Sequence, residues 1–195
     1  MDKAIITGAT GLVGLSVTNY LISRGVDVLA LGRKKLDSDQ LNNLFTESIT
    51  YLDVNMKDID NLPLYLKDIK WDVGEECIFY NFAWGGINTL TDGDFSSQMQ
   101  NAVNSSKAVR VAKEIGCKKY INLGTIQETI CEDYLTKNYP KSHKISQLNY
   151  SLSKLASRDL SKINAYLNSI DYIHTRLSMP IDPSLANGTY FASSL

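Results

Sequence analysis

Cysteine is scarce in this sequence, and its scarcity excludes several classes of protein. Three cysteines occur among 195 residues, at Cys77, Cys117 and Cys131. Their odd number argues against a disulfide framework, and their wide spacing lacks the close pairs typical of metal ligands. We therefore expect reduced thiols that pack in the interior or lie on the surface, a cytoplasmic location, and no metal centre.

A strong charge of either sign is also lacking, as is a long uninterrupted hydrophobic run. The 20 basic and 21 acidic residues leave a net charge of −1 and a pI near 6.1, which gives no reason to expect nucleic acid or an anionic membrane as partner. The largely apolar first 23 residues are interrupted by Thr7, Thr10 and three glycines, without the basic region or cleavage site of a signal peptide. These absences leave a small molecule as the expected partner.

Linkers rich in proline, glycine or serine and internal repeats are absent too, and 195 residues suffice for one substantial core, so we expect one domain. Apolar runs alternate with amphipathic stretches of helix length, the pattern of a parallel sheet covered on both faces. The expected strands are 3–7, 27–31, 49–52, 76–82, 119–123 and 170–176, and the expected helices are 12–23, 37–46, 59–69, 93–115 and 147–168. Right-handed crossovers would wind these units into a Rossmann-type, doubly wound α/β sheet with ligands at the carboxyl ends of the strands.

The most informative feature is the spacing of three glycines where the first strand meets the first helix. Gly8 would turn the chain, Gly11 would let the backbone approach a pyrophosphate, and Gly14 would let the helix lie close to the sheet. The pattern predicts a dinucleotide whose phosphates lie at the helix N-terminus, and the alternative is a tight turn without a ligand. The cofactor-binding residues expected here are Gly8, Thr10, Gly11, Leu12, Val13 and Gly14.

The end of the second strand predicts which dinucleotide binds. An NAD-selective site places an acidic residue there for the ribose hydroxyls, whereas this chain has Gly32 followed by Arg33 and two lysines. Arg33 would suit the 2′-phosphate of NADP, with NAD as the other cofactor considered and a solvated basic loop as the alternative without a ligand. Asp53, at the end of the third strand, would either accept a hydrogen bond from adenine or cap the next helix.

Tyr150 and Lys154 form the candidate reaction centre. Their spacing places a phenol and an ammonium on one face of a helix, and adjacent positive charge would move the pKa of the phenol from about 10 toward neutrality. The pair follows a strand that ends at Gly124 and Thr125. Thr125 would offer a hydroxyl to the substrate oxygen or cap the strand end. Asn101 would hold its helix, relay a proton or be an ordinary helix amide.

In their order along the chain, these motifs resemble the extended short-chain dehydrogenases/reductases, the group of NAD(P)-dependent sugar epimerases and dehydratases. The motifs are the glycine turn, the segment Asn81–Gly86, Gly124-Thr125, the Tyr150-xxx-Lys154 pair and the segment Arg176–Pro180. The resemblance covers residues 3–183 and implies a catalytic set of Thr125, Tyr150, Lys154 and Asn101. It also implies cofactor contacts from Asp53, Val54, Phe82, Ala83, Trp84, Tyr150, Lys154, Met179 and Pro180.

Within that group, the segments Phe82–Gly86 and Gly124-Thr125 look most like the nucleotide-sugar 4-ketoreductases. This resemblance implies reduction of a nucleotide-linked 4-keto-6-deoxyhexose by NADPH, with a nucleotide sugar as the small-molecule partner. Ile126 and Gln127 replace the Asp-Glu pair of the sugar dehydratases, so dehydration is not expected. A 4-epimerase and a non-catalytic dinucleotide-binding module stay open as alternatives.

The end of the sequence bears on domain organisation. Residues 1–183 would form the NAD(P)-binding domain, and residues 184–195 would begin a C-terminal segment that is truncated relative to the family, whose later part supplies much of the sugar-nucleotide pocket. Thr129 is a second departure, because many members have tyrosine there. The resemblance also allows a homodimer through helices 93–115 and 147–168.

Overall fold

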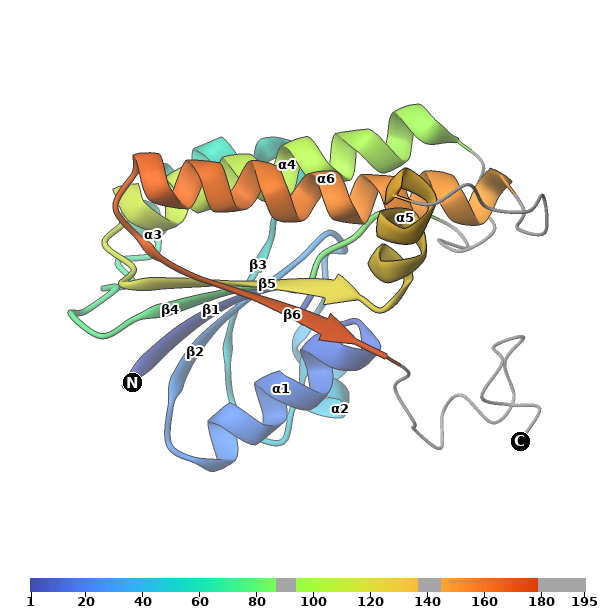
Figure 1. The fold of residues 1–195 in the computed structure, drawn as a ribbon. Coiled ribbons are helices and arrows are strands. Elements are labelled where there is room, and N and C mark those ends of the chain that lie inside the picture. The colour runs from blue at the N-terminus through green and yellow to red at the C-terminus, as the bar shows by residue number, and fades with distance from the viewer. Residues whose placement is uncertain (87–93, 137–144, 179–195) are drawn as a thin grey trace.

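The computed structural model describes residues 1–86, 94–136 and 145–178, which form a six-stranded sheet with helices on both faces (Figure 1). The strands are β1 (Lys3–Thr7), β2 (Asp27–Gly32), β3 (Thr50–Asp53), β4 (Ile78–Asn81), β5 (Lys119–Thr125) and β6 (Asp171–Leu177). Neighbouring strands pair in parallel in the order β3-β2-β1-β4-β5-β6. The order reverses between β1 and β4, where a doubly wound sheet opens a crevice for ligands. The predicted Rossmann-type fold is confirmed.

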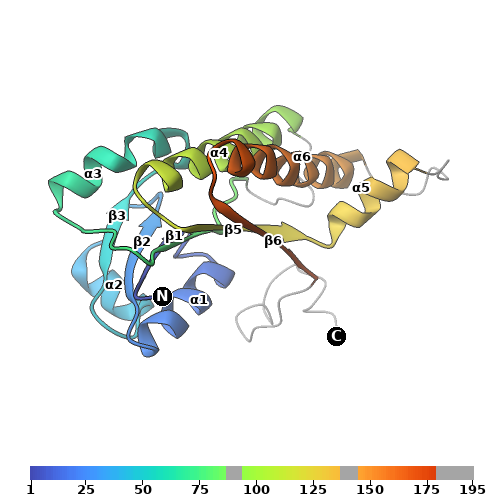
Figure 2. The same cartoon turned by 60° about the vertical axis from the view of Figure 1, so that its left-hand side comes forward.

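The helices lie in two layers. α1 (Leu12–Ser23) and α2 (Ser38–Leu44) cover one face, and α3 (Leu62–Asp68), α4 (Phe95–Glu114) and α6 (Ile145–Leu167) cover the other (Figure 1, Figure 2). A 3₁₀ helix, η1 (Met56–Asn61), precedes α3, and α5 (Gln127–Thr136) follows the carboxyl end of β5. Among these described helices, none is long and apolar enough to cross a membrane.

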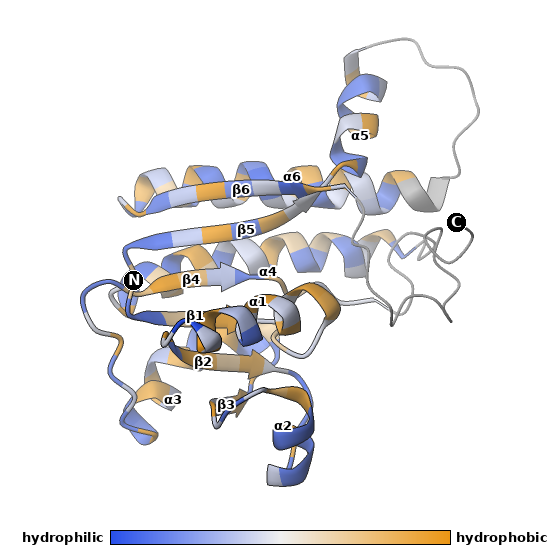
Figure 3. Cartoon of the chain, turned by 90° about the horizontal axis from the view of Figure 1, so that it is seen from below, coloured by the Kyte–Doolittle hydropathy of each residue, from blue (hydrophilic) through white to orange (hydrophobic). Residues whose placement is uncertain are grey.

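Alternating side chains along the strands build a core on each face of the sheet. In β1, Ile5 belongs to the core under α3 and α4, whereas Ala4 and Ile6 belong to the core under α1. Because successive side chains of a strand point to opposite faces, a central strand covered on both sides must be apolar throughout. Figure 3 shows this in β2, which is largely orange. The two cores fix the strand ends, where the candidate site lies.

Most predicted elements are confirmed to within a few residues, and three differ. The expected strand 76–82 is confined to β4, which pairs with β1 over only four positions. The expected helix 59–69 begins as η1 and becomes α-helical at Leu62, where Pro63 suits the first turn. Helix α5 was not predicted. Thr125-x-x-Glu128, which spans the start of α5, nevertheless matches the capping-box pattern that is typical of helix N-termini.

Candidate active site

The turn between β1 and α1 is built around the three spaced glycines. Gly8 has a φ of +68°, and a Cβ there would lie 2.8 Å from the backbone nitrogen of Ala83. A Cβ on Gly14 would overlap the carbonyl oxygen of Gly8, so α1 starts directly against the turn. Gly11 donates its N–H to the Gly8 carbonyl at 2.9 Å and is the N-cap of α1, with no side chain to bond the first N–H groups of the helix. These groups, at the positive end of the helix dipole, are suited to bind an anion.

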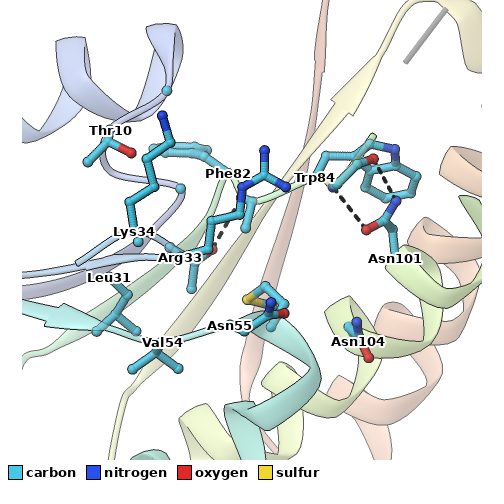
Figure 4. Close-up of a pocket in the computed structure, with 17 residues that line it drawn as sticks. Thr10, Leu31, Arg33, Lys34, Val54, Asn55, Phe82, Trp84, Asn101 and Asn104 are labelled. Carbon is cyan, nitrogen blue, oxygen red and sulfur yellow. Dashed lines mark hydrogen bonds between the residues drawn. The ribbon is translucent and has the colours of Figure 1, made fainter. Parts of the chain in front are cut away.

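A cavity of about 350 Å³ opens in front of this turn (Figure 4). Its lining includes residues expected from the sequence, Gly8, Thr10, Gly11, Arg33, Val54, Phe82, Ala83, Trp84 and Asn101. It also includes residues that were not among the predicted cofactor contacts, Thr7, Leu31, Gly32, Lys34, Asn55, Met56, Gly85 and Asn104, although Gly32, Lys34 and Gly85 lie in segments that the sequence singled out. Of the other expected contacts, Leu12, Val13 and Gly14 belong to the first turn of α1, and Asp53 ends β3. The structure thus brings the glycine turn, the basic strand end and the loop after β4 to one cavity.

Basic side chains reach the cavity from the end of β2. Arg33 and Lys34 both line it, and the close-up shows both side chains extending along it (Figure 4). Tyr51 donates its hydroxyl to the Lys34 carbonyl oxygen at 2.6 Å, which holds the backbone of this segment. A Cβ on Gly32 would overlap the same hydroxyl, so an acidic side chain at this position would require Tyr51 to move. Burial raises the pKa of Tyr51, with Asp53 adding to the rise, and the phenol therefore stays a donor.

The loop after β4 is tied to α4 by two amide side chains, those of Asn101 and the buried Gln98. Asn101 Oδ1 accepts from the Gly85 N–H, and Asn101 Nδ2 donates to the Gly85 carbonyl oxygen, both at 2.9 Å. Trp84 Nε1 donates to Oε1 of the fully buried Gln98 at 2.7 Å. Because the oxygen and the nitrogen of the Asn101 amide both bond the backbone of Gly85, Asn101 fixes the position of the loop that borders the cavity.

Lys154 is buried beside the same loop. Its Nζ donates to the Leu123 carbonyl oxygen at 3.0 Å and lies 3.8 Å from the centre of the Trp84 ring. Burial lowers the pKa of Lys154 to about 7, while the negative charge of Glu128 opposes the fall. The carbonyl oxygen and the face of the indole ring both stabilise the ammonium form. The contact with Trp84 carries no local sequence signal.

Tyr150, one helical turn before Lys154, faces Trp84 and Thr125. Its ring meets the Trp84 ring edge-on, with 6.1 Å between centres, and the nearby Thr125 side chain lowers the pKa of its phenol. Burial raises the pKa of Tyr150 to about 12, and the charge of Glu128 adds to the rise. The expected lowering of this pKa by Lys154 is not found, because the ammonium lies 6.0 Å from the centre of the Tyr150 ring and burial dominates. The phenol is therefore protonated at neutral pH, the state of a proton donor.

Thr125 ends β5, and the start of α5 folds back on it. The Thr125 N–H donates to Glu128 Oε1 at 2.9 Å, and Thr125 Oγ1 accepts from the Gln127 N–H at 3.3 Å. Glu128 is fully buried and also contacts His174 and Arg176 of β6. Sequence reasoning missed Glu128 and His174, which are 46 positions apart.

Two predicted cofactor contacts, Met179 and Pro180, lie outside the described residues. Within the three described ranges, no group of histidine, cysteine or acidic side chains is arranged to hold a metal ion.

Solved structures share the fold of this chain. WbmG of Bordetella bronchiseptica in complex with NAD has a TM-score of 0.68 and 16% identity, over 95% of this chain and 56% of its own. The UDP-Glc/GlcNAc 4-epimerase of Campylobacter jejuni has a TM-score of 0.66 and 17% identity, over 97% and 58%. The UDP-glucuronic acid 4-epimerase of Bacillus cereus in complex with NAD has a TM-score of 0.62 and 19% identity, over 91% and 56%. The chain spans little more than half the length of these structures.

Sequence comparison leads to the family. No curated protein matches the chain. The profile of the NAD dependent epimerase/dehydratase family, however, matches residues 4–194, a range that contains the glycine turn, Thr125 and the Tyr150/Lys154 pair. The chain therefore belongs to the NAD-dependent epimerase/dehydratase family.

Proposed function

We propose that this chain is the dinucleotide-binding and catalytic part of an NADP-preferring reductase, which acts on the 4-ketone of a nucleotide-linked 6-deoxyhexose. One observation carries the proposal. Tyr150 is half-buried beside Thr125 and protonated at neutral pH, and its neighbour Trp84 lines the cavity in front of the glycine turn. Residues 1–183 would form the NAD(P)-binding domain.

The residues around the cavity fit a nicotinamide dinucleotide. Gly8 and Gly14 leave no room for a Cβ, and the uncapped N–H groups after Gly11 suit a pyrophosphate. Val54 would meet the adenine, and Trp84 would border the nicotinamide end. WbmG and the Bacillus cereus 4-epimerase were both solved with NAD, which supports the same class of cofactor for this chain.

A preference for NADP rests on the end of β2. Arg33 and Lys34 line the cavity there, and a guanidinium can bond a phosphate through two parallel N–H groups. Tyr51 fills the space that an acidic residue at Gly32 would need, so the group that would bind the ribose hydroxyls of NAD and repel a 2′-phosphate is missing.

The chain's own residues would control the proton and the geometry of the reaction. When bound, NADPH supplies the hydride that reduces the C4 carbonyl. Tyr150 would give its phenol proton to the C4 oxygen as that oxygen becomes a hydroxyl, while the Thr125 hydroxyl would hydrogen-bond the same oxygen. Lys154 would hold the cofactor ribose. A protonated phenol suits reduction, because the tyrosine must first donate a proton.

A 4-epimerase is the second candidate, and the structural neighbours favour it. The Campylobacter jejuni and Bacillus cereus proteins are both 4-epimerases of UDP-sugars. An epimerase must begin by oxidising its substrate, which demands a base, whereas a reductase begins with the proton donation for which the protonated Tyr150 is suited. Because an epimerase regenerates its cofactor, the two activities differ in whether NADPH is consumed.

Two measurements test the proposal. Mass spectrometry would identify the dinucleotide retained by the purified protein, and absorbance would follow NADPH consumption with a panel of nucleotide-linked 4-keto sugars. We expect retained NADP(H) and one NADPH consumed for each sugar reduced. Sugar conversion without net NADPH consumption would favour the 4-epimerase. Cofactor binding without any conversion would favour a non-catalytic module, and binding of no dinucleotide would contradict every version of the proposal.

A further inference from the structure

A row of polar side chains, buried except for the half-buried His174, runs across the β1–β6 part of the sheet next to the candidate active site. We call it the polar row, and its members are Thr7 of β1, Asn81 of β4, Asn122 of β5, His174 of β6 and Glu128 of α5. Thr7 Oγ1 donates to Asn81 Oδ1 at 2.7 Å, and Asn81 Nδ2 donates to Asn122 Oδ1 at 3.0 Å. Asn122 Nδ2 lies 3.4 Å from His174 Nδ1, and His174 Nε2 lies 2.9 Å from Glu128 Oε2. The contacts are continuous from the central strand β1 to the edge strand β6 and on to α5.

The hydrogen bonds of the polar row share one direction. The Ala83 N–H donates to Thr7 Oγ1 at 3.2 Å, and Thr7 Oγ1 donates to Asn81 Oδ1. The Ser105 hydroxyl donates to the Asn101 carbonyl oxygen, so it accepts from the Asn81 nitrogen, which agrees with this orientation of the Asn81 amide. Asn81 then presents its amide nitrogen to Asn122, which accepts with its oxygen and donates with its own nitrogen. His174 Nδ1 must accept from Asn122, and the Tyr172 hydroxyl, 3.3 Å away, faces the same nitrogen. The ring proton of His174 therefore lies on Nε2 and is donated to the carboxylate.

The other end of the polar row meets the active-site threonine. Glu128 accepts from the Thr125 N–H at 2.9 Å and from Arg176 Nε at 3.2 Å, in addition to His174. Space is so limited that a Cβ on Gly124 would overlap His174 Nε2 and Glu128 Oε1. The residue before Thr125 can therefore carry no side chain, and Thr125 is held by its backbone.

We propose that His174 and Glu128 are positioning residues that direct the Thr125 hydroxyl at the reacting oxygen, and that the polar row gives this arrangement a single hydrogen-bond direction. The inference rests on the proposed function, in which Thr125 bonds the substrate oxygen. Glu128 uses the Thr125 N–H, and the Gln127 N–H occupies a lone pair of Thr125 Oγ1. The Thr125 hydroxyl proton is then available to point toward Tyr150, whose pKa the Thr125 side chain lowers.

Packing alone does not account for the polar row. A buried carboxylate and imidazole are costly unless their polar atoms are bonded, and apolar residues of similar volume would fill the same space. Instead, two members of the polar row make additional buried hydrogen bonds. Asn81 also donates to Ser105, and Asn122 also donates to Ser157. The charge of Glu128 also raises the pKa values of Tyr150 and Lys154, which favours a protonated phenol and a charged ammonium, the two states that reduction needs.

Nitrogen NMR of the cofactor-free chain tests the direction of the polar row without any substrate. The chain has two histidines, so a His143→Gln variant assigns the His174 signals. At pH 7.5 we expect the proton on Nε2 of His174. Asn122→Asp replaces the donor facing Nδ1 with an acceptor of the same shape, and it should move a proton onto Nδ1. A wild-type proton on Nδ1, or an unchanged tautomer in Asn122→Asp, would overturn the fixed direction.

A matched pair of variants tests the positioning role. Glu128 and Glu132 lie one turn apart in α5 and both bond Arg176, but only Glu128 reaches Thr125. Glu128→Gln should move the Thr125 amide proton signal and lower kcat about tenfold to a hundredfold, with little change in the KM for NADPH. Glu132→Gln should do neither. Equal effects of the two substitutions, or a rise in KM as large as the fall in kcat, would mean that Glu128 has only a structural role.

A milder variant keeps the test valid if Glu128→Gln fails to fold, as judged by circular dichroism. His174→Gln retains a donor toward Glu128, so it should preserve more of kcat than His174→Leu, which retains none. Equal losses in the two would contradict the positioning role. Failure of the proposed function looks different, because no 4-keto sugar would then be reduced by the wild-type protein while the His174 tautomer and the Thr125 amide signal would still be as expected.

Discussion

The two halves of the sheet are built on different principles. In β2, the four residues Val28–Leu31 are buried and apolar, and polar groups occur only at the strand end. In β5 and β6, Asn122 and His174 place polar atoms in the interior, and Figure 3 shows white and blue stretches along both strands. The apolar half provides a stable edge for the cofactor, whereas the polar half carries hydrogen bonds through the protein to the reaction centre. Stability and chemistry are thus separated along one sheet.

The largest effect should come from removing the hydroxyl oxygen of Tyr150, in helix α6 beside the polar half of the sheet. Tyr150→Phe keeps the ring against Trp84 but deletes the proton donor, so turnover should fall about 10²- to 10⁴-fold with nearly unchanged cofactor affinity. Tyr166→Phe, at an exposed position of the same helix, is the matched control. Steady-state kinetics with a verified substrate measures both. Rates for Tyr150→Phe within a few-fold of wild type would rule out Tyr150 as the general acid.

The second prediction compares one buried position in each half. Leu29→Ala creates a cavity in the apolar half and should reduce the free energy of unfolding by about 2–5 kcal/mol, with activity retained in the folded fraction. Asn122→Leu conserves volume but removes the hydrogen bonds that Asn122 makes to Asn81 and His174, at about 1–3 kcal/mol. It should cost more turnover than Leu29→Ala. Urea unfolding measures the loss of stability in both variants, and steady-state kinetics measures the loss of turnover. If Asn122→Leu lost more stability than Leu29→Ala, or if Leu29→Ala lost more turnover, the proposed difference between the two halves would be wrong.

Lys154, in helix α6 beside the polar half of the sheet, should make the free energy of unfolding depend on pH. Its pKa is about 7 in the fold against 10.5 in the unfolded chain, so the unfolded state binds more protons between these values. The destabilisation is complete below pH 7 and vanishes above about pH 10.5, with an upper bound of about 5 kcal/mol. Lys154→Met should therefore be more stable than wild type at pH 6, and the difference should shrink as pH rises.

Thermal unfolding from pH 6 to 10 measures this difference, with Lys162→Met, an exposed position of the same helix, as control. The same Lys154→Met protein should bind the dinucleotide more weakly, since it lacks the ammonium proposed to hold the ribose. A stability difference that is independent of pH would mean that the ammonium is not desolvated in the folded protein.

The smallest effect belongs to the rim of the apolar half. Arg33→Ala should reduce the preference for NADPH over NADH by about ten- to a hundredfold, because charge-assisted hydrogen bonds contribute about 1.5–3 kcal/mol. The preference should also decrease with added salt. Lys35→Ala is the control, as Lys35 is not among the residues that line the cavity. Calorimetric titration of both cofactors measures the effect, and equal affinities in wild type would leave Arg33 as part of a solvated loop.

The parts of the molecule that the sequence predicts are those signalled within a short stretch of chain. The glycine turn, the apolar strands and the Tyr150/Lys154 spacing each need only a few neighbouring residues. The polar row could not be predicted, because the Asn122–His174 contact joins positions 52 apart and each residue alone is an ordinary polar residue in a strand. Glu128 did have a local signal, the capping-box spacing from Thr125.

The Tyr51 hydroxyl beneath Gly32 has a consequence for how cofactor choice can evolve. An aspartate at position 32 would introduce a Cβ where the phenol lies and would displace it from the Lys34 carbonyl oxygen, which frees the segment that carries Arg33. A smaller residue at position 51 alone would empty that space without supplying a partner for the ribose hydroxyls. Neither change by itself produces a good NAD site. The route from one proposed cofactor to the other therefore passes through a variant that binds both poorly, unless the two positions change together.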